Sequence, residues 1–313
     1  MSAAAILLIA FLLEALLGWP AWLHARIGHP VTWIGALIDR LDRQLNRPAW
    51  TRRTQRAAGL AAVAITVGLT VAVAWLLDTA LPDGPLGLLL AGLLAWPLLA
   101  TRSLYDHAMA VADPLAKDDL AAARKAVSKI VGRDPEQLDQ AGVGRATLES
   151  LAENSSDGIV APVFWGLLLG LPGIAAYKAV NTLDSMIGHR TERHVAFGWA
   201  AARLDDLVNL VPARLTGLLF VGTSPRPRAA LDCMLRDAHR HRSPNAGWPE
   251  AAMAGALGVR LSGPRSYGAE TSQEPWLNES APDPLPEDLL HGLALFRRAM
   301  ALLAVLLLLL ALL

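Results

Sequence analysis

Three polar clusters inside or beside apolar segments hold the residues of this chain that are suited to chemistry. The first is ESLAENSSDG at 149–158, where Glu149, Glu153 and Asp157 recur every four residues. On a helix these carboxylates share one face. They repel one another unless a cation lies among them, and a Mg²⁺-nucleotide would supply one. An isolated acidic triplet is more often a solvated helix face.

The second cluster, YKAVNTLDSMIGHR at 177–190, directly follows an apolar run. Tyr177, Asn181 and Asp184 fall on one helical stripe, with Lys178 beside them. One stripe therefore presents an amide, a carboxylate and an ammonium group.

The third cluster, RLDDLVNLVPARL at 203–215, lies at the start of another apolar run. Asp205 and Asn209 are four residues apart, with Asp206 adjacent and Arg214 further along. Capping of a helix N-terminus would explain one aspartate but not Asn209 and Arg214. Charged groups in a membrane are costly and are usually retained for function, so these clusters are candidate site residues.

Two loops combine arginine with glycine, serine or asparagine, namely VGRDP at 131–135 and RHRSPNAGWPE at 240–250. Such loops can offer backbone N–H groups to an anion, although most are plain turns. The chain has neither a GxxxxGK[ST] nor a GxGxxG motif, so a bound nucleotide would not be held by a standard glycine loop.

The composition indicates the class of fold that holds these clusters. The chain has 313 residues, 53% hydrophobic and 18% charged, and a mean hydropathy of +0.36, which is typical of a membrane protein. Its apolar runs do not alternate with period two, which argues against a β-barrel. Equal numbers of basic and acidic residues, 28 each, argue against a nucleic-acid partner. We expect an all-α, polytopic integral membrane helical bundle with cytoplasmic helices and loops.

A single membrane domain over 1–313 is expected, with spans at about 3–17, 57–77, 86–101, 159–177, 207–222 and 300–313. Arginine-rich segments are retained in the cytoplasm, which places about 102–157 and 224–298 there and the N-terminus outside. Gly170, Pro172 and Gly173 interrupt the fourth run, so we expect it to turn back. The expected location is the cell inner membrane, with the active site facing the cytoplasm.

Six longer stretches stand in a specific order along the chain: HPVTWIGALIDRLD at 29–42, VGRD at 131–134, ESLAENSSDGIVAPVFW at 149–165, YKAVNTLDSMIGHR at 177–190, FGWAAARLDDLVNLVPARLTG at 197–217 and SPNAGWPEAAMAGALGVRL at 243–261. Together they resemble the adenosylcobinamide-phosphate synthase family of cobalamin biosynthesis over about residues 14–268. Two residues depart from the family pattern. Ser262 stands where a glycine is expected and His189 where an aromatic residue is common.

The resemblance implies an integral membrane enzyme that consumes ATP and requires Mg²⁺. It would join a propionate carboxylate of adenosylcobyric acid to the amine of (R)-1-amino-2-propanol or its O-phosphate, giving adenosylcobinamide or its phosphate. The corrinoid substrate comes from the resemblance alone. The other expected partners are the lipid bilayer and either a second copy of the chain or further membrane enzymes of the pathway.

The residues are compatible with this chemistry. A carboxylate is a poor electrophile, so amide formation is expected to proceed through an acyl phosphate, and phosphoryl transfer mostly needs positioning and charge neutralisation. The candidate catalytic residues are Glu153, Asp157, Asp184 and Lys178. The candidate Mg²⁺ ligands are Glu153, Asp157, Asp184 and Asp205 or Asp206. The candidate ATP- or substrate-binding residues are Arg133, Asn154, Asn181, Arg203, Asn209, Arg214, Ser243 and Asn245.

The sequence does not assign the general base or the residues that close over the substrates. Any carboxylate of these clusters that is left without metal is a candidate for the general base that deprotonates the amine. The SPNAG loop at 243–247 and Tyr267 are hypothesised to close over the nucleotide or the corrinoid.

Two other classes of function compete with this interpretation. An intramembrane Mg²⁺-dependent prenyl or phospho-alcohol transferase is suggested by NTLD and LDDLVN, but the expected pair of DxxxD motifs is missing. A non-catalytic transporter or membrane sensor is the other alternative, although the inverted repeats common in transporters are not apparent. Acceptor-dependent ATP hydrolysis would separate the amide synthase from both.

Overall fold

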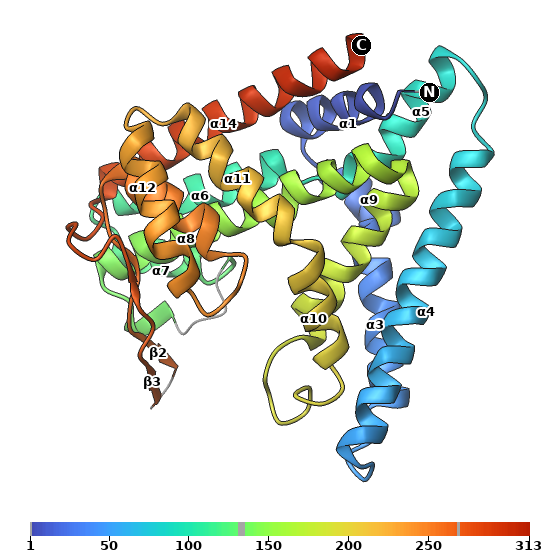
Figure 1. The fold of residues 1–313 in the computed structure, drawn as a ribbon, viewed down its shortest axis with the longest axis horizontal. Coiled ribbons are helices and arrows are strands. Elements are labelled where there is room, and N and C mark those ends of the chain that lie inside the picture. Colours follow the sequence, from blue (N-terminus) through green and yellow to red (C-terminus); the bar gives the residue numbers. More distant parts are fainter. Residues whose placement is uncertain (1, 131–134, 268–269) are drawn as a thin grey trace. The chain divides into compact units, whose positions relative to one another are not determined.

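The computed structural model describes residues 2–130, 135–267 and 270–313. Its helices are α1 Ala3–Leu17, α2 Ala21–Ile27, α3 Pro30–Leu45, α4 Arg52–Thr79, α5 Pro85–Ala95, α6 Thr101–Leu115, α7 Leu120–Val127, α8 Gln140–Ser155, α9 Ala161–Ile187, α10 Trp199–Val208, α11 Leu210–Thr223, α12 Pro227–Asp237, α13 Gly247–Leu257 and α14 Pro286–Leu312 (Figure 1). Four short strands, β1 Leu261–Ser262, β2 Arg265–Tyr267, β3 Glu270–Ser272 and β4 Trp276–Leu277, form the antiparallel pairs β1–β4 and β2–β3. The expected all-α fold class is confirmed.

Among the described residues, four helical segments are long and apolar enough to cross a membrane: Arg52–Thr79, Pro85–Leu115, Gln140–Ile187 and Pro286–Leu312. The bent pair Ala3–Leu17 and Ala21–Leu45, with an angle of 112°, makes a fifth if it is counted as one span. Several helices of this kind define a polytopic membrane protein.

The observed helix boundaries differ from several of the expected runs. The run 207–222 coincides largely with the 14-residue helix α11, about 21 Å long. The run 86–101 lies within the segment Pro85–Leu115, and the last helix begins at Pro286 rather than at 300. Residues 140–157 open the 48-residue helical segment Gln140–Ile187, which is a candidate span on the strength of one 18-residue apolar window. The expected cytoplasmic location of residues 140–157 stays a prediction.

The chain packs as two compact units, each built from separate stretches. Unit 1 comprises Met1–Ala100, Ala161–Asn209 and Leu307–Leu313, and unit 2 comprises Thr101–Val160 and Leu210–Leu306. The single membrane domain expected from the sequence stays a prediction.

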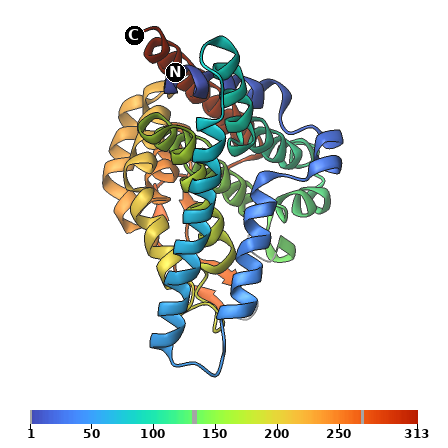
Figure 2. The same ribbon diagram turned by 90° about the vertical axis from the view of Figure 1, so that its right-hand side faces the viewer.

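In unit 1, the long helix α4 packs against α3, α9 and α10, and these four helices lie side by side in Figure 1 and Figure 2. Their shared core includes Ile38, Leu183, Phe197 and Ala201. A glycine permits the closest approach, since a Cβ at Gly59 would lie 1.8 Å from the carbonyl oxygen of Phe197. The segment that precedes α10 therefore lies directly on the backbone of α4.

The expected break in the fourth run is observed inside α9. Gly170 has a φ of +66° and a ψ of −153°, which interrupts the helix, and Pro172 follows two residues later. Positive φ is readily adopted only by glycine. A Cβ at Gly173 would lie 2.3 Å from the carbonyl oxygen of Trp165, so the helical segments on the two sides of the break approach closely.

In unit 2, α13 packs against α8, α11 and α12, and α8 also contacts α6 and β1. Trp276 of β4 stands between two cations, with the guanidinium carbons of Arg145 and Arg260 lying 5.4 and 4.2 Å from its ring centroid. Both arginines also pair with Asp283. This cluster ties α8 to the segments around the short strands.

Gly59→Ala is expected to destabilise unit 1, because the added methyl group collides with the Phe197 carbonyl. Overpacking of this kind typically costs about 1–3 kcal/mol. The matched control is Gly68→Ala in the same helix, where a Cβ meets no heavy atom within 4 Å. Thermal unfolding of the detergent-purified variants should show a clearly lower midpoint for Gly59→Ala only. Equal midpoints for the two variants would contradict the close packing of α4.

Candidate functional site

A buried hydrogen-bond chain links α9 to the end of α10. The Tyr177 hydroxyl donates to Asn209 Oδ1 at 2.9 Å, and Asn209 Nδ2 donates to Asp205 Oδ2 at 3.1 Å. Tyr177 and Asn209 are buried. Because its amide oxygen and one amide N–H are engaged in this way, Asn209 is placed to orient the Asp205 carboxylate.

Lys178 is also buried in unit 1, with a relative exposure of 9%, and it makes contacts within the protein. It lies close enough to His29, the residue before α3, to interact electrostatically with it. A buried ammonium group is costly unless it is compensated by partners. Lys178 is therefore held inside the unit rather than displayed on its surface.

Asp184, near the end of α9, lies close to Asp206 of α10 and to His189, and the three side chains interact electrostatically. Gly188 makes room for this carboxylate, since a Cβ there would lie 2.0 Å from Asp184 Oδ1. The fold thus brings together Asp184 and Asp206, two of the candidate Mg²⁺ ligands. Asn181 lies one turn before Asp184, where its backbone carbonyl accepts a hydrogen bond from Ser185.

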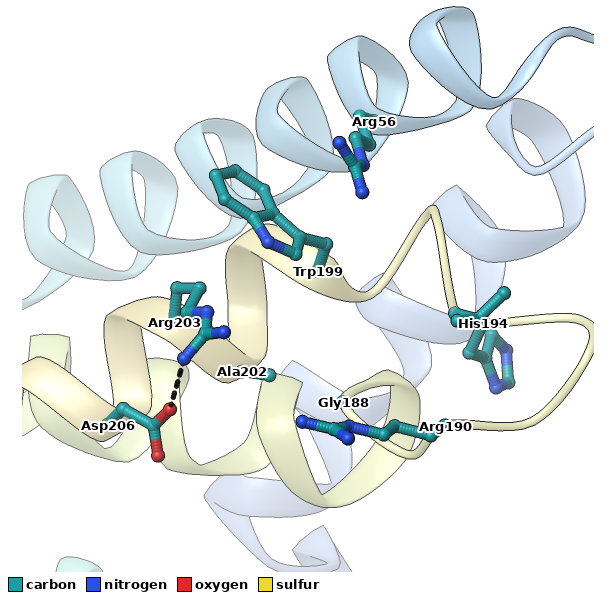
Figure 3. A pocket seen from close by; sticks show the side chains of 9 residues that line it. Arg56, Gly188, Arg190, His194, Trp199, Ala202, Arg203 and Asp206 are labelled. Carbon is teal, nitrogen blue, oxygen red and sulfur yellow. Dashed lines mark hydrogen bonds and ion pairs between the residues drawn. The ribbon is translucent and has the colours of Figure 1, made fainter. Parts of the chain in front are cut away.

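A cavity of about 350 Å³ lies beside these carboxylates within unit 1. Figure 3 shows its lining, which consists of Arg56, Gly188, Arg190, His194, Val195, Trp199, Ala202, Arg203 and Asp206. Arg203 Nη1 lies 3.4 Å from Asp206 Oδ2, and the Arg56 guanidinium carbon lies 5.5 Å from the Trp199 ring centroid. Sequence reasoning selected Arg203 and Asp206 but missed the other cationic groups. The signal that could have found Arg190 is the series of basic residues at and after IGHR, namely Arg190, Arg193 and His194.

One carboxylate anchors the loop that carries Arg190 and His194. Asp42 of α3 accepts hydrogen bonds from Arg193 Nη2 at 2.5 Å and Asn46 Nδ2 at 2.8 Å, and it lies 3.4 Å from His194 Nε2. Asn46 Nδ2 also donates to the carbonyl oxygen of Arg193 at 3.0 Å. Asp42, which sequence reasoning did not select, therefore fixes one wall of the cavity.

In unit 2, the acidic triplet extends from the α-helix α8 into the π-helical turn that follows it. Glu149 is buried, and its Oε1 accepts a hydrogen bond from the Ser262 backbone N–H at 2.8 Å. The helix then changes from α to π at Ser156–Val160, which places Asp157 in the π-helical turn and shifts it relative to Glu153. Such turns occur often at functional sites. Asn154 Nδ2 donates to the carbonyl oxygen of Ser150 at 2.9 Å.

The loop before α13 forms a tightly bonded turn. Ser243 Oγ accepts hydrogen bonds from the backbone N–H groups of Asn245 and Ala246, each at 3.2 Å. His241 Nε2 lies 3.7 Å from Glu250 Oε2, and both side chains are buried. The two N–H groups that an anion would need are thus already donating to Ser243. Asn245 is buried and makes contacts within the protein.

Arg214 of α11 stacks on Trp248 of α13, with its guanidinium carbon 4.3 Å from the ring centroid. Its Nη1 donates to the carbonyl oxygen of Leu210 at 2.6 Å. Arg133 lies outside the described residues, as does the side chain of Tyr267.

The candidate residues divide between the units. Unit 1 contains Lys178, Asn181, Asp184, Arg203, Asp205, Asp206 and Asn209, and unit 2 contains Glu153, Asn154, Asp157, Arg214, Ser243 and Asn245. Within the described part of the chain, no group of three or more His, Cys, Asp or Glu residues is arranged to hold a metal ion. Magnesium, however, is usually bound by one or two carboxylates together with substrate phosphates, and the Asp184–Asp206 pair suits that arrangement.

The fold and these polar clusters define a polytopic α-helical membrane protein with charged groups retained inside its packed units. A family model described as CobD/CbiB protein matches residues 7–296, and the chain belongs to this family.

Curated relatives cover nearly the whole chain. A protein of Rhodobacter capsulatus is 62% identical over 301 residues, which are 96% of this chain and 95% of that protein. Proteins of Brucella suis and Rhizobium meliloti are 50% and 47% identical, over 87% and 88% of this chain and 86% of each relative. All three are named cobalamin biosynthesis protein CobD. No solved structure matches.

Ser262→Gly is expected to stabilise the protein by about 1 kcal/mol. Ser262 has a φ of +61°, a conformation that favours glycine, and its Oγ is buried with no hydrogen-bond partner in the described structure. Ser262→Ala removes the hydroxyl but keeps the backbone strain, so it should gain less. Thermal unfolding midpoints of the three proteins test this order, and a lower midpoint for Ser262→Gly would refute it.

Asp237→Asn is expected to lower stability at neutral pH by about 2 kcal/mol. Burial alone would raise the pKa of the Asp237 carboxyl, but hydrogen bonds from Arg236 and the Asn278 backbone outweigh it, so the pKa is lowered. The ionised carboxylate therefore stabilises the fold above about pH 4, and this contribution disappears as the pH falls through the lowered pKa.

Thermal unfolding midpoints measured from pH 7 down to pH 3 should show a gap between wild type and Asp237→Asn that closes on the acid side. Asp232→Asn, an exposed position in the same helix, is the control and should follow wild type. A gap that stays constant with pH would show that the charge of Asp237 is not the cause.

Proposed function

We propose that this chain is an enzyme of cobalamin biosynthesis, an ATP-dependent amide synthase of the membrane. The family membership and the names of the relatives support the pathway. The proposed reaction joins adenosylcobyric acid to (R)-1-amino-2-propanol or its O-phosphate to give adenosylcobinamide or its phosphate. The observation that carries an enzymatic role is the gathering of buried Lys178, the Asp184–Asp206 pair and Arg203 within one unit.

The reaction divides into two steps. In the first, an oxygen of the propionate carboxylate attacks the γ-phosphorus of ATP, the bond to the bridging oxygen breaks and ADP leaves. In the second, the amine nitrogen attacks the acyl carbon, inorganic phosphate leaves and the nitrogen loses its proton. Both steps need charge neutralisation and positioning more than covalent help from the protein.

The residues of unit 1 meet these needs in separate ways. Asp184 and Asp206 would hold Mg²⁺, which when bound neutralises phosphate oxygens. Lys178 and Arg203 donate to phosphate or carboxylate oxygens. Asp205 is held by Asn209 and Tyr177, so its carboxylate has a fixed orientation for accepting the proton of the amine.

The candidate residues of unit 2 are proposed as binding groups within that unit. Glu153 and Asp157 are proposed as acidic ligands for a metal–nucleotide, and Asn154, Arg214, Ser243 and Asn245 as groups that bind ATP or substrate. The π-helical turn at Asp157 supports this assignment for α8. The active site is proposed to face the cytoplasm, where ATP is available.

The deciding experiment is a mass-spectrometric assay of the detergent-purified protein with adenosylcobyric acid, Mg²⁺-ATP and aminopropanol, with and without phosphate on the amine. A new amide together with acceptor-dependent ADP is expected, and the productive amine identifies the acceptor. Absence of product with either amine from folded protein would overturn the proposal. Consumption of a lipid diphosphate instead would favour the prenyltransferase class.

Asp184→Asn is expected to reduce amide formation at least about 100-fold, since it removes one proposed metal ligand while keeping the size of the side chain. Asp39→Asn is the matched control, because the Asp39 side chain is 49% exposed on α3 and, among the described residues, forms an ion pair with Arg43 alone, so its activity should equal wild type. A Mg²⁺ titration of both variants adds a second measurement. If Asp184→Asn kept its rate and its Mg²⁺ requirement, Asp184 would be removed from the site.

A further inference from the structure

The cavity of unit 1 carries an excess of positive charge. Arg56, Arg190 and Arg203 line it together with a single carboxylate, Asp206, which is 3.4 Å from Arg203. Neither Arg56 nor Arg190 forms an ion pair within the described residues. His194 also lines the cavity, and its Nε2 faces Asp42. At least two guanidinium groups are therefore available to an anion.

These guanidinium groups converge from three segments. Figure 3 shows Arg56 on α4, Arg203 on α10 and Arg190 on the loop between α9 and α10, with Arg190 and Arg203 pointing toward one another. Trp199 lies under Arg56, and the cation–π contact restrains that side chain. A planar guanidinium donates two parallel hydrogen bonds to phosphate oxygens, so several of them around one cavity match a phosphate group.

The walls of the cavity are held in place before any ligand binds. Asp42 fixes Arg193 and His194 in the loop. A Cβ at Gly198 would lie 1.6 Å from the carbonyl oxygen of Ile187, so the two ends of the same loop are in close backbone contact. Such preorganisation lowers the entropic cost of binding.

Two residues that line the cavity are of types that are common at the ends of membrane spans. Arg56 stands in the second turn of α4, a candidate span that begins at Arg52 and of whose apolar window only 22% is buried inside the protein. Trp199 is 45% exposed. Arginine and tryptophan at the end of a span are typical of the headgroup region.

We propose that this cavity is a binding site for a phosphate group, presented either by the headgroup of an anionic phospholipid or by a soluble phosphate ester. Its volume of about 350 Å³ suits a headgroup or a small ester. The cavity shares Arg203 and Asp206 with the site proposed for amide synthesis, so the inference rests in part on that proposal, but it concerns binding of a phosphate group and does not require turnover.

The test is isothermal titration calorimetry on the detergent-purified full chain with four probes. These are sodium phosphate, phosphoethanolamine, dihexanoyl-phosphatidylglycerol below its micellar concentration and sodium chloride at matched ionic strength. Saturable binding of at least one phosphate probe, but not of chloride, is expected. Binding of the lipid alone identifies a headgroup site, and binding of the soluble probes identifies a phosphate-ester site.

Three single variants locate the site. Arg56→Gln and Arg190→Gln should each weaken binding about tenfold, the cost of one charge-assisted hydrogen bond. Arg40→Gln, an exposed arginine of α3 outside the cavity lining, removes the same charge and should bind as wild type. Circular dichroism and gel-filtration profiles establish that the variants are folded. Arg56 and Arg190 are exposed, so their replacement leaves the core intact.

Two results would overturn the proposal. One is the absence of saturable binding of every phosphate probe to folded wild-type protein. The other is an equal loss of affinity in Arg40→Gln and Arg190→Gln, which would mean that net charge and not the cavity attracts the anion. The amide assay of the wild type is scored separately, so failure of one proposal does not imply failure of the other.

Discussion

In a chain this apolar, a polar group that leaves water must find its partner inside the protein, and the rest of the structure depends on that constraint. Asn209 meets it by joining Tyr177 to Asp205, and Glu149 meets it by accepting the Ser262 backbone N–H. The Tyr177–Asn209 and Glu149–Ser262 bonds join residues 32 and 113 positions apart in the sequence. A buried donor or acceptor left without its partner would lower the stability of the fold by about 1–3 kcal/mol. These hydrogen bonds therefore favour the native packing over alternatives in which the same groups are unpaired.

Close packing at glycines is the second requirement of this structure, because segments must approach closely before their buried groups can form hydrogen bonds. Gly59 and Gly198 bring the loop before α10 onto α4 and onto the end of α9. Gly188 leaves space for the Asp184 carboxylate. Small residues at helix contacts are a general device of membrane proteins, in which the hydrophobic effect does not drive helices together. Here the same device also determines where the charged side chains point.

The sequence was sufficient for the features that depend on local pattern. The apolar runs predicted a polytopic helical protein, and Gly170 predicted the break in α9. Sequence was insufficient where burial by another segment overrides the pattern. Residues 140–157 carry several charges, yet Glu149 among them is buried. The 207–222 run was expected as one apolar segment, but the helix there begins at Leu210 and has 14 residues.

The same limit applies to the candidate site. Spacing placed Tyr177, Asn181 and Asp184 on one helix, as α9 does, but Asp205 and Arg214 fall on the separate helices α10 and α11. Spacing also gave no information about partners from other helices. Asp42 was not selected because a single aspartate in an amphipathic helix is common. Its role is apparent only in the fold, where Arg193 and His194, 151 and 152 residues later in the sequence, contact its carboxylate. The acidic triplet shows a related limit, since Asp157 lies in the π-helical turn after Ser155 and not in the regular α-helix that the four-residue spacing assumed.

The stretch from α9 to α10 combines two opposite electrostatic requirements. It supplies the carboxylates Asp184 and Asp206 and also the cations Arg190 and Arg203, and Asp206 belongs to both sets, since it interacts with Asp184 and pairs with Arg203. A cation bound near Asp184 would also attract the Asp206 carboxylate, which would weaken the ion pair between Asp206 and Arg203. That arginine would then be free to bind an anion. Occupancy of the two neighbouring sites would thus be coupled through a single carboxylate, with no movement of the backbone required.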